Sequence, residues 1–369
     1  MRSHGKTLDS RFRGNDNRAV QKSSPRKRGP RTWIPAFAGM TIGIALVFLA
    51  GCATPQKQAD LIWPLPPEKP RIKYLYAIST SDDIREDTFG RQIKNVVIGA
   101  DESSRLVKPY AVHVDHDGRI FVADSSWGKV LLFDRNKHTF TVLGLDGEGI
   151  LAKPLGITTD SQGQIYVTDT AQNRAVIYDR DGKFLKAIGT LGTFDQPVGI
   201  GVNDALGRIY VVDTKKHNIQ TFDKDGKPLF TIGQRGTEDG NFNFPTNIVI
   251  DKDGKLYVTD SFNFRVQIFD PDGKFILKFG EVGTGFGHFS KPKGIAVDSE
   301  GHIYVSDAAF NNVQIFNPDG QLLMYFGEFG NKPGYFWLPA GMDIDDQNRI
   351  YVADQYNHRI NVYQFLGGD

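Results

Sequence analysis

Short segments that alternate apolar and polar residues recur along the chain between residues 109 and 363. Each repeat contains a β-branched and aromatic segment that ends in aspartate. The six segments are Ile120–Asp124, Ile165–Asp169, Ile209–Asp213, Leu256–Asp260, Ile303–Asp307 and Ile350–Asp354. Their aspartates are 45, 44, 47, 47 and 47 residues apart. A period of ~40–50 residues is typical of proteins whose units pack only against their neighbours.

One repeat predicts four strands. In residues 292–327, the segments Gly294–Asp298, His302–Ser306, Asn312–Phe316 and Gln321–Phe326 each read as a strand, and glycine-containing turns separate the first from the second and the third from the fourth. Four antiparallel strands form one blade of a β-propeller. We therefore predict an all-β fold, a six-bladed β-propeller of four-stranded antiparallel blades.

The two ends of the chain predict how the ring closes. The last repeat stops at Asp369, too soon for a fourth strand. The missing strand is present upstream, because Arg71–Ile78 resembles the fourth strands Lys183–Ile188 and Lys227–Ile232. We expect this N-terminal strand to complete the last blade and to join the ends of the ring by backbone hydrogen bonds.

The repeated motifs also carry a family resemblance. Pro-x-Gly-Ile-Ala-Val-Asp at 292–298, Gly-x-Ile-Tyr-Val-x-Asp at 301–307 and Asn-x-Arg-Val-Gln-x-Phe at 263–269 resemble the NHL repeat. Asn357–Arg359 stands where that family has Asn-His-Leu. The resemblance covers all six units and implies a propeller. The family includes RNA-binding, protein-binding and sensor domains and a zinc-dependent amidating lyase. The resemblance therefore predicts the fold but not the function.

The N-terminal region predicts an export signal. Ala36–Ala50 is apolar apart from Thr41, and basic residues precede it. Leu49–Cys52, with the sequence Leu-Ala-Gly-Cys, resembles the lipobox of bacterial lipoproteins, which implies cleavage before Cys52 and lipidation of its thiol. The apolar stretch is shorter than the ~20 residues that a membrane span needs, and the whole segment fits a signal peptide.

These features divide the chain into three parts. Residues 1–51 are the signal or leader segment, of which 1–39 resemble translated intergenic repeat sequence. Translation could therefore start nearer the apolar core, although a start at Met40 would remove the basic residues of the signal. Residues 52–70 are a lipidated tether, semi-rigid because of its five prolines. Residues 71–369 form the propeller.

The net charge and the cysteine content limit the classes of partner and the covalent links that we expect. Residues 1–51 hold ten of the 44 basic and two of the 43 acidic side chains, so the mature chain has a net charge of −7. Nucleic-acid binding needs a basic footprint and is not expected. Lipidation of Cys52, the only cysteine, excludes a disulfide. Ala53 replaces the aspartate that favours inner-membrane retention in enterobacterial lipoproteins. We predict an outer-membrane lipoprotein in the bacterial envelope, a monomeric propeller that needs no cofactor.

Internal repetition separates scaffold from candidate site. Residue types present in every unit, such as the six strand-ending aspartates, are expected to cap their own loops. Function is expected where the exposed loops between second and third strands differ from one another. Those loops carry large aromatics and two lysines, which we predict to bind ligand as one recognition surface. The residues are Trp127, Lys215, Lys216, Phe262, Phe310 and Tyr356.

Catalytic signals are few. In the register of the innermost strands, His113 and Asp343 are the two titratable candidates for the channel. One histidine and one carboxylate do not provide the three protein ligands that zinc requires, so we predict no metal site and no catalytic residues. The predicted function is a lipid-anchored envelope module that binds a protein, peptide or glycan on its loop face. The alternatives are an envelope-assembly lipoprotein and a lyase or lactonase at the channel mouth.

Overall fold

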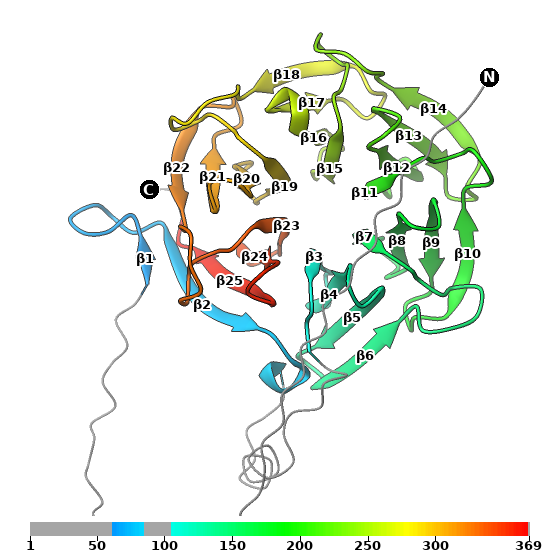
Figure 1. Ribbon diagram of the computed structural model, residues 1–369, viewed down its shortest axis with the longest axis horizontal. Coiled ribbons are helices and arrows are strands. Elements are labelled where there is room, and N and C mark those ends of the chain that lie inside the picture. The colour runs from blue at the N-terminus through cyan, green and yellow to red at the C-terminus, as the bar shows by residue number, and fades with distance from the viewer. Residues whose placement is uncertain (1–60, 85–104, 368–369) are drawn as a thin grey trace, which may run out of the picture. The chain divides into compact units, whose positions relative to one another are not determined.

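The computed structural model describes residues 61–84 and 105–367 (Figure 1). The predicted signal segment, Cys52 and the first part of the tether lie outside these residues. The described chain forms six sheets arranged in a ring, with the innermost strand of each sheet toward the centre (Figure 1). The predicted all-β, six-bladed propeller is confirmed.

Five blades are four-stranded antiparallel sheets in simple chain order. Blade one is β3 Pro109–Val114, β4 Arg119–Asp124, β5 Lys129–Asp134 and β6 Thr139–Leu143, and blade two is β7 Pro154–Thr159, β8 Ile165–Asp169, β9 Arg174–Tyr178 and β10 Phe184–Ile188. Blade three is β11 Pro197–Asn203, β12 Arg208–Asp213, β13 Asn218–Asp223 and β14 Pro228–Ile232. Blade four is β15 Pro245–Ile250, β16 Leu256–Asp260, β17 Arg265–Phe269 and β18 Phe275–Phe279, and blade five is β19 Pro292–Val297, β20 Ile303–Asp307, β21 Asn312–Phe316 and β22 Leu322–Phe326.

Blade six joins the two ends of the chain. It contains β23 Pro339–Ile344, β24 Arg349–Asp354, β25 Arg359–Phe365, β2 Ile72–Ile78 and β1 Ile62–Trp63. Strand β2 pairs antiparallel with β25 from Ile72↔Phe365 to Ile78↔Ile360, which confirms the predicted closure. The fifth strand corrects the predicted tether: Ile62 and Trp63 pair with Lys73 and Ile72, so the sheet begins within residues 52–70.

The apolar core is divided among the six blade interfaces. Each of six buried clusters combines residues of two adjacent blades, as between Phe133 of blade one and Val362 of blade six. The reason is the alternation of each strand, which presents one row of side chains to each neighbouring blade. Stability therefore depends on every blade having two neighbours, and ring closure supplies the last interface.

Four of the six strand-ending aspartates cap their own loops through backbone N–H groups as predicted, whereas Asp260 and Asp354 hold their loops through the side-chain amides of Asn263 and Asn357. All six are fully buried. Asp124, for example, accepts hydrogen bonds from the N–H groups of Ser126 and Trp127 in its own loop and of Val107 and Lys108 in the connection before the blade. One carboxylate thus holds both loop types together on one face of the ring, which we call the loop face.

Most fourth strands contain a β-bulge. Between β9 and β10, Phe184 pairs with Tyr178 and Lys186 with Ile177, so Leu185 is an extra residue. The same shift occurs in five of the six blades, at an exposed apolar residue each time. These residues are Leu75, Leu185, Leu229, Ile276 and Leu323.

Candidate functional site

The innermost strands of neighbouring blades approach one another closely. A Cβ atom added at Gly156 would lie 2.1 Å from the carbonyl oxygen of Val198, and one at Gly294 would lie 2.2 Å from that of Ala340. Only glycine permits neighbouring innermost strands to approach so closely. At the centre of the ring, toward the turns between first and second strands, these strands line a cavity of about 300 Å³.

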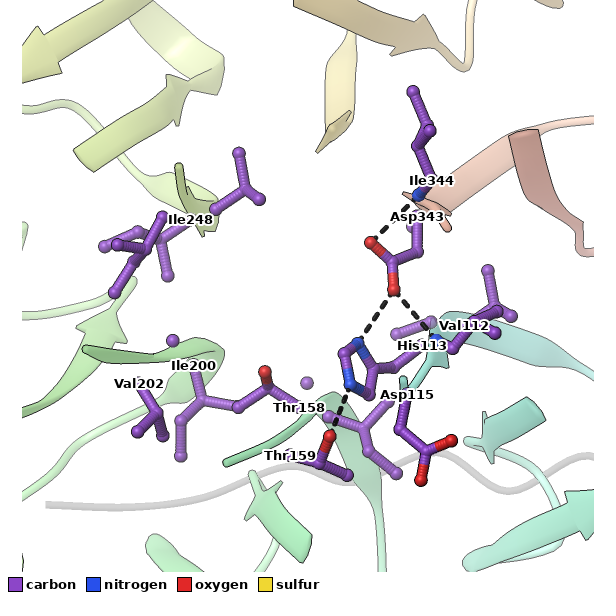
Figure 2. A pocket seen from close by; sticks show the side chains of 18 of the residues that line it. Val112, His113, Asp115, Thr158, Thr159, Ile200, Val202, Ile248, Asp343 and Ile344 are labelled. Carbon is purple, nitrogen blue, oxygen red and sulfur yellow. Dashed lines mark hydrogen bonds and ion pairs between the residues drawn. The ribbon is translucent and has the colours of Figure 1, made fainter. Parts of the chain in front are cut away.

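The cavity brings together the two predicted channel residues. His113 of β3 and Asp343 of β23 come from blades one and six, and their side chains pair at 2.8 Å between Nδ1 and Oδ2. Each side chain is 18% exposed. Figure 2 shows that the imidazole lies between Asp343 and Thr159 of β7, whose Oγ1 is 2.9 Å from His113 Nε2. Three blades therefore meet in one polar cluster.

Thr159 is a site residue that sequence reasoning missed. The register of the repeat places Thr158, not Thr159, in the position of His113 and Asp343. The structure shows that the side chain in this register reaches forward to the next blade, as Asp343 does to the N–H of Val114 at 2.8 Å. His113 makes the equivalent contact with Thr159. The sequence feature that could have pointed to Thr159 is the pair of consecutive threonines, Thr158 and Thr159, at the end of the innermost strand β7.

The mouth of the cavity is acidic, and most of its carboxylates have partners. Asp115 pairs with Arg119 at 2.6 Å, and Asp345 makes the same contact with Arg349. The exposed pair of His116 and Asp346 crosses from blade one to blade six at 2.9 Å, and its hydrogen bond raises the pKa of His116. Within the described residues, no group of three or more His, Cys, Asp or Glu side chains is arranged to hold a metal ion.

The six residues predicted to bind ligand all lie in loops between second and third strands on the loop face, and they come from blades one, three, four, five and six. Phe262 is 60% exposed, and its ring packs on that of Phe244 at 5.0 Å. Tyr356 is 42% exposed and stacks on Trp337 at 5.5 Å. These two rings project a large apolar area into solvent.

The other four residues predicted to bind ligand are less accessible to a ligand or have their charge engaged by neighbours. Trp127 and Phe310 are half-buried. Lys216 is exposed, yet its Nζ donates to the carbonyl oxygens of Gly192 and Thr193. Lys215 lies 3.7 Å from Asp195, which partly balances its charge. The positive spot predicted at Lys215 and Lys216 is therefore weaker than the sequence suggests.

The connections between blades also carry exposed aromatic residues, which lie outside the loops between second and third strands. Phe329 is exposed and contacts Trp337 edge to face at 5.8 Å. Phe329, Trp337 and Tyr356 thus form one continuous surface, which we call the aromatic strip. Lys108 of blade one extends it, with Nζ 5.3 Å from the centre of the Tyr356 ring. Phe329 stands where the two preceding connections have Arg235 and Val282, so a comparison of the connections would have found it.

A second lysine lies at the loop-face end of the channel. Lys293, the second residue of β19, places its Nζ 5.6 Å from the centre of the Tyr110 ring. Burial and the nearby charges of Lys291 and Lys108 lower the pKa of Lys293 to about 8. These lysines give the centre of the loop face a basic character, in contrast to the acidic mouth of the cavity at the turns between first and second strands.

Comparisons with known proteins agree with this architecture. The NHL repeat matches residues 194–222 and 336–363, and a six-bladed β-propeller domain matches residues 252–309. The chain therefore carries NHL repeats within a six-bladed propeller. A sequence search of curated proteins finds no match.

Solved structures show the same fold at low sequence identity. An auxiliary nutrient-binding protein from Bacteroides thetaiotaomicron is 16% identical with a TM-score of 0.55, covering 70% of this chain and 69% of its own. A streptogramin B lyase is 14% identical with a TM-score of 0.54, covering 70% and 94%. A gluconolactonase from Xanthomonas campestris is 18% identical with a TM-score of 0.54, covering 70% and 86%. These likenesses establish the fold and leave the activity open.

Proposed function

We propose that the chain is a lipid-anchored protein of the bacterial envelope whose propeller binds a protein, peptide or glycan through its loop face. The aromatic strip is the observation that carries this proposal. Three stacked or edge-packed rings, with a lysine beside them, expose apolar area on the loop face. Such exposed aromatics with a neighbouring cation are typical of recognition surfaces.

The fold supports a binding or scaffold role. A nutrient-binding protein shares the propeller architecture, and NHL repeats provide a rigid ring with variable loops on one face. The anchoring part of the proposal rests on Leu49–Cys52 and on the short apolar stretch before it. Within residues 61–84 and 105–367, the structure contains no helix of the length and hydropathy that a membrane span requires.

Removal of the aromatic strip is expected to abolish ligand capture. Trp337→Ala with Tyr356→Ala removes both rings that form the centre of the strip, and truncation at the centre of a contact typically costs ~2 kcal/mol or more, about a 30-fold loss of affinity. The measurement is retention of envelope proteins and glycans from solubilised membranes on the immobilised protein. Titration of each retained component then gives its affinity for the parent and variant proteins.

The matched control is Leu229→Ala with Leu323→Ala, which removes two exposed apolar side chains from the outer strands. This control is expected to retain the ligand, and both variants are expected to keep the parent's circular dichroism spectrum and melting temperature. Equal capture by the parent and the aromatic variant would place the binding surface elsewhere.

Replacement of Cys52 is expected to release the protein from the membrane. Cys52→Ala removes the only thiol that could carry a diacylglycerol. Incorporation of labelled palmitate should disappear, and the protein should stay unprocessed or move to the soluble fraction. Cys52→Ser provides a second variant of nearly the same volume. Unchanged fractionation and unchanged mass in both variants would contradict lipidation at this position.

A further inference from the structure

The polar cluster in the channel cavity has no part in loop-face binding. Asp343, His113 and Thr159 form a continuous chain of contacts, with 2.8 Å between Asp343 Oδ2 and His113 Nδ1 and 2.9 Å between His113 Nε2 and Thr159 Oγ1 (Figure 2). All three residues line the cavity. A hydroxyl, an imidazole and a carboxylate in this order are the groups of an activated nucleophile, its base and the group that orients the base.

The hydrogen bonds of Asp343 fix the direction of the chain. Its Oδ2 also accepts from the N–H of Val114 at 2.8 Å, and its Oδ1 accepts from the N–H of Ile344 at 2.9 Å. His113 Nδ1 lies 2.8 Å from the same Oδ2, and a carboxylate at this distance favours the tautomer that carries the proton on Nδ1. The Nε2 atom of a neutral imidazole is then the acceptor, and the Thr159 hydroxyl donates to it.

The backbone supplies a donor for a developing negative charge. The N–H of Asp160 donates to the carbonyl oxygen of Gln164 across the β7–β8 pair, so alternation turns the N–H of Thr159 to the opposite edge of β7. The equivalent N–H in blade one, that of Val114, points across the blade boundary to Asp343. No acceptor for the Thr159 N–H is recorded among residues 61–84 and 105–367.

We propose that Thr159, His113 and Asp343 form a catalytic relay that hydrolyses small esters in the channel cavity. The Thr159 Oγ1 attacks the acyl carbon while His113 Nε2 takes its proton, and the Thr159 N–H donates to the resulting oxyanion. His113 returns the proton to the leaving alkoxide as the carbon–oxygen bond breaks, which leaves an acyl ester on Thr159. Water, deprotonated by His113, then releases the carboxylic acid and restores the hydroxyl. Asp343 holds the imidazole in the required tautomer.

The cavity sets the substrate class. A volume of about 300 Å³ is at the lower end of the range for small-molecule sites, so the ligand is small. Ile200, Ile248 and Met342 form apolar walls that suit a short aliphatic acyl group. Of the described residues that line the cavity, six are aspartates and none is lysine or arginine, so anionic compounds are disfavoured even though several of these carboxylates pair with cations outside the lining. Neutral or cationic esters of short-chain acids are the expected substrates.

The test measures release of p-nitrophenol from p-nitrophenyl acetate and p-nitrophenyl butyrate by the purified full-length protein. We expect hydrolysis above the buffer rate, and a fall of roughly 100-fold or more in Thr159→Val and His113→Gln. Asp343→Asn is expected to lower the rate without a matching change in KM. Rapid quenching with the acetate ester should leave one acetyl group on the peptide that contains Thr159.

Thr231→Val is the matched control, because Thr231 is an exposed threonine of the outer strand β14 and does not line the cavity. It should retain the parent rate, and Thr159→Ser should retain turnover and the acyl adduct. Melting curves show whether each variant is folded. Three results would overturn the proposal: no hydrolysis of either ester by the parent, equal loss in folded Thr231→Val and Thr159→Val, or acetylation only at other residues.

Discussion

Deletion of residues 71–78 is expected to open the propeller and to remove most of its cooperative unfolding transition. Strand β2 is the fourth strand of blade six, and no other segment within residues 61–84 and 105–367 pairs with β25 on that side. Ile72 and Ile78 are fully buried in two different interfaces, those of blade six with blades five and one. Burial of each isoleucine contributes about 1.5–3 kcal/mol, and the lost backbone pairing adds to this.

Thermal unfolding followed by circular dichroism measures the effect. Deletion of residues 61–70 is the control, since it removes β1 and the contacts of Trp63 with Phe326 and Tyr363 but leaves β2 in the sequence. It is expected to lower the melting temperature much less. If deletion of 71–78 changes the melting temperature by less than about 2 °C, β2 does not close the ring.

Asp307→Ala is expected to destabilise the protein by roughly 3–5 kcal/mol. The fully buried carboxylate of Asp307 accepts from the N–H groups of Ser290 and Lys291 before the blade and of Ala309 and Phe310 in its own loop. Removal of the carboxylate leaves four backbone donors of two loops without their acceptor. Urea unfolding gives the change from the transition midpoint at constant slope.

Two variants separate this capping role from a general effect of removing negative charge. Asp307→Asn keeps one side-chain acceptor and is expected to lose part of the stability. Asp319→Ala removes an exposed aspartate from a turn of the same blade and should change stability by no more than about 0.5 kcal/mol. A change of that small size in Asp307→Ala would show that the loops do not need the carboxylate.

Most of the scaffold could be predicted because the same pattern of strands, turns and capping aspartates occurs in all six repeats. The repeat places a turn-forming or capping residue at each strand end, so the loops between second and third strands, such as 125–128 and 308–311, have the predicted bounds. The closing strand was recognisable as well, and its observed range of Ile72–Ile78 begins one residue later than predicted. Repetition also assigned the buried aspartates to structure, as their hydrogen bonds confirm.

Features that occur once could not be found in this way. Strand β1 has only two residues, Ile62 and Trp63, within a proline-rich segment whose composition indicates a tether. Its pairing depends on the hairpin with β2 and on Trp63 packing against blade five, neither of which leaves a periodic pattern.

The candidate sites also depend on contacts that occur only once in the described residues, so repetition could not predict them. The contacts of His113 link residues 46 and 230 positions apart in the sequence, and only the closed ring makes them neighbours. Sequence reasoning named His113 and Asp343 from their shared register. It could not place the Thr159 hydroxyl at the imidazole, because that contact depends on how far one innermost strand lies from the next.

The bulges in the fourth strands determine how neighbouring molecules can meet. An extra residue interrupts the ladder of free N–H and C=O groups along most of the outer rim, and a foreign strand aligned there would lose register at Leu185, Ile276 or Leu323. Two copies that meet rim to rim would therefore not align their outer strands into one continuous sheet.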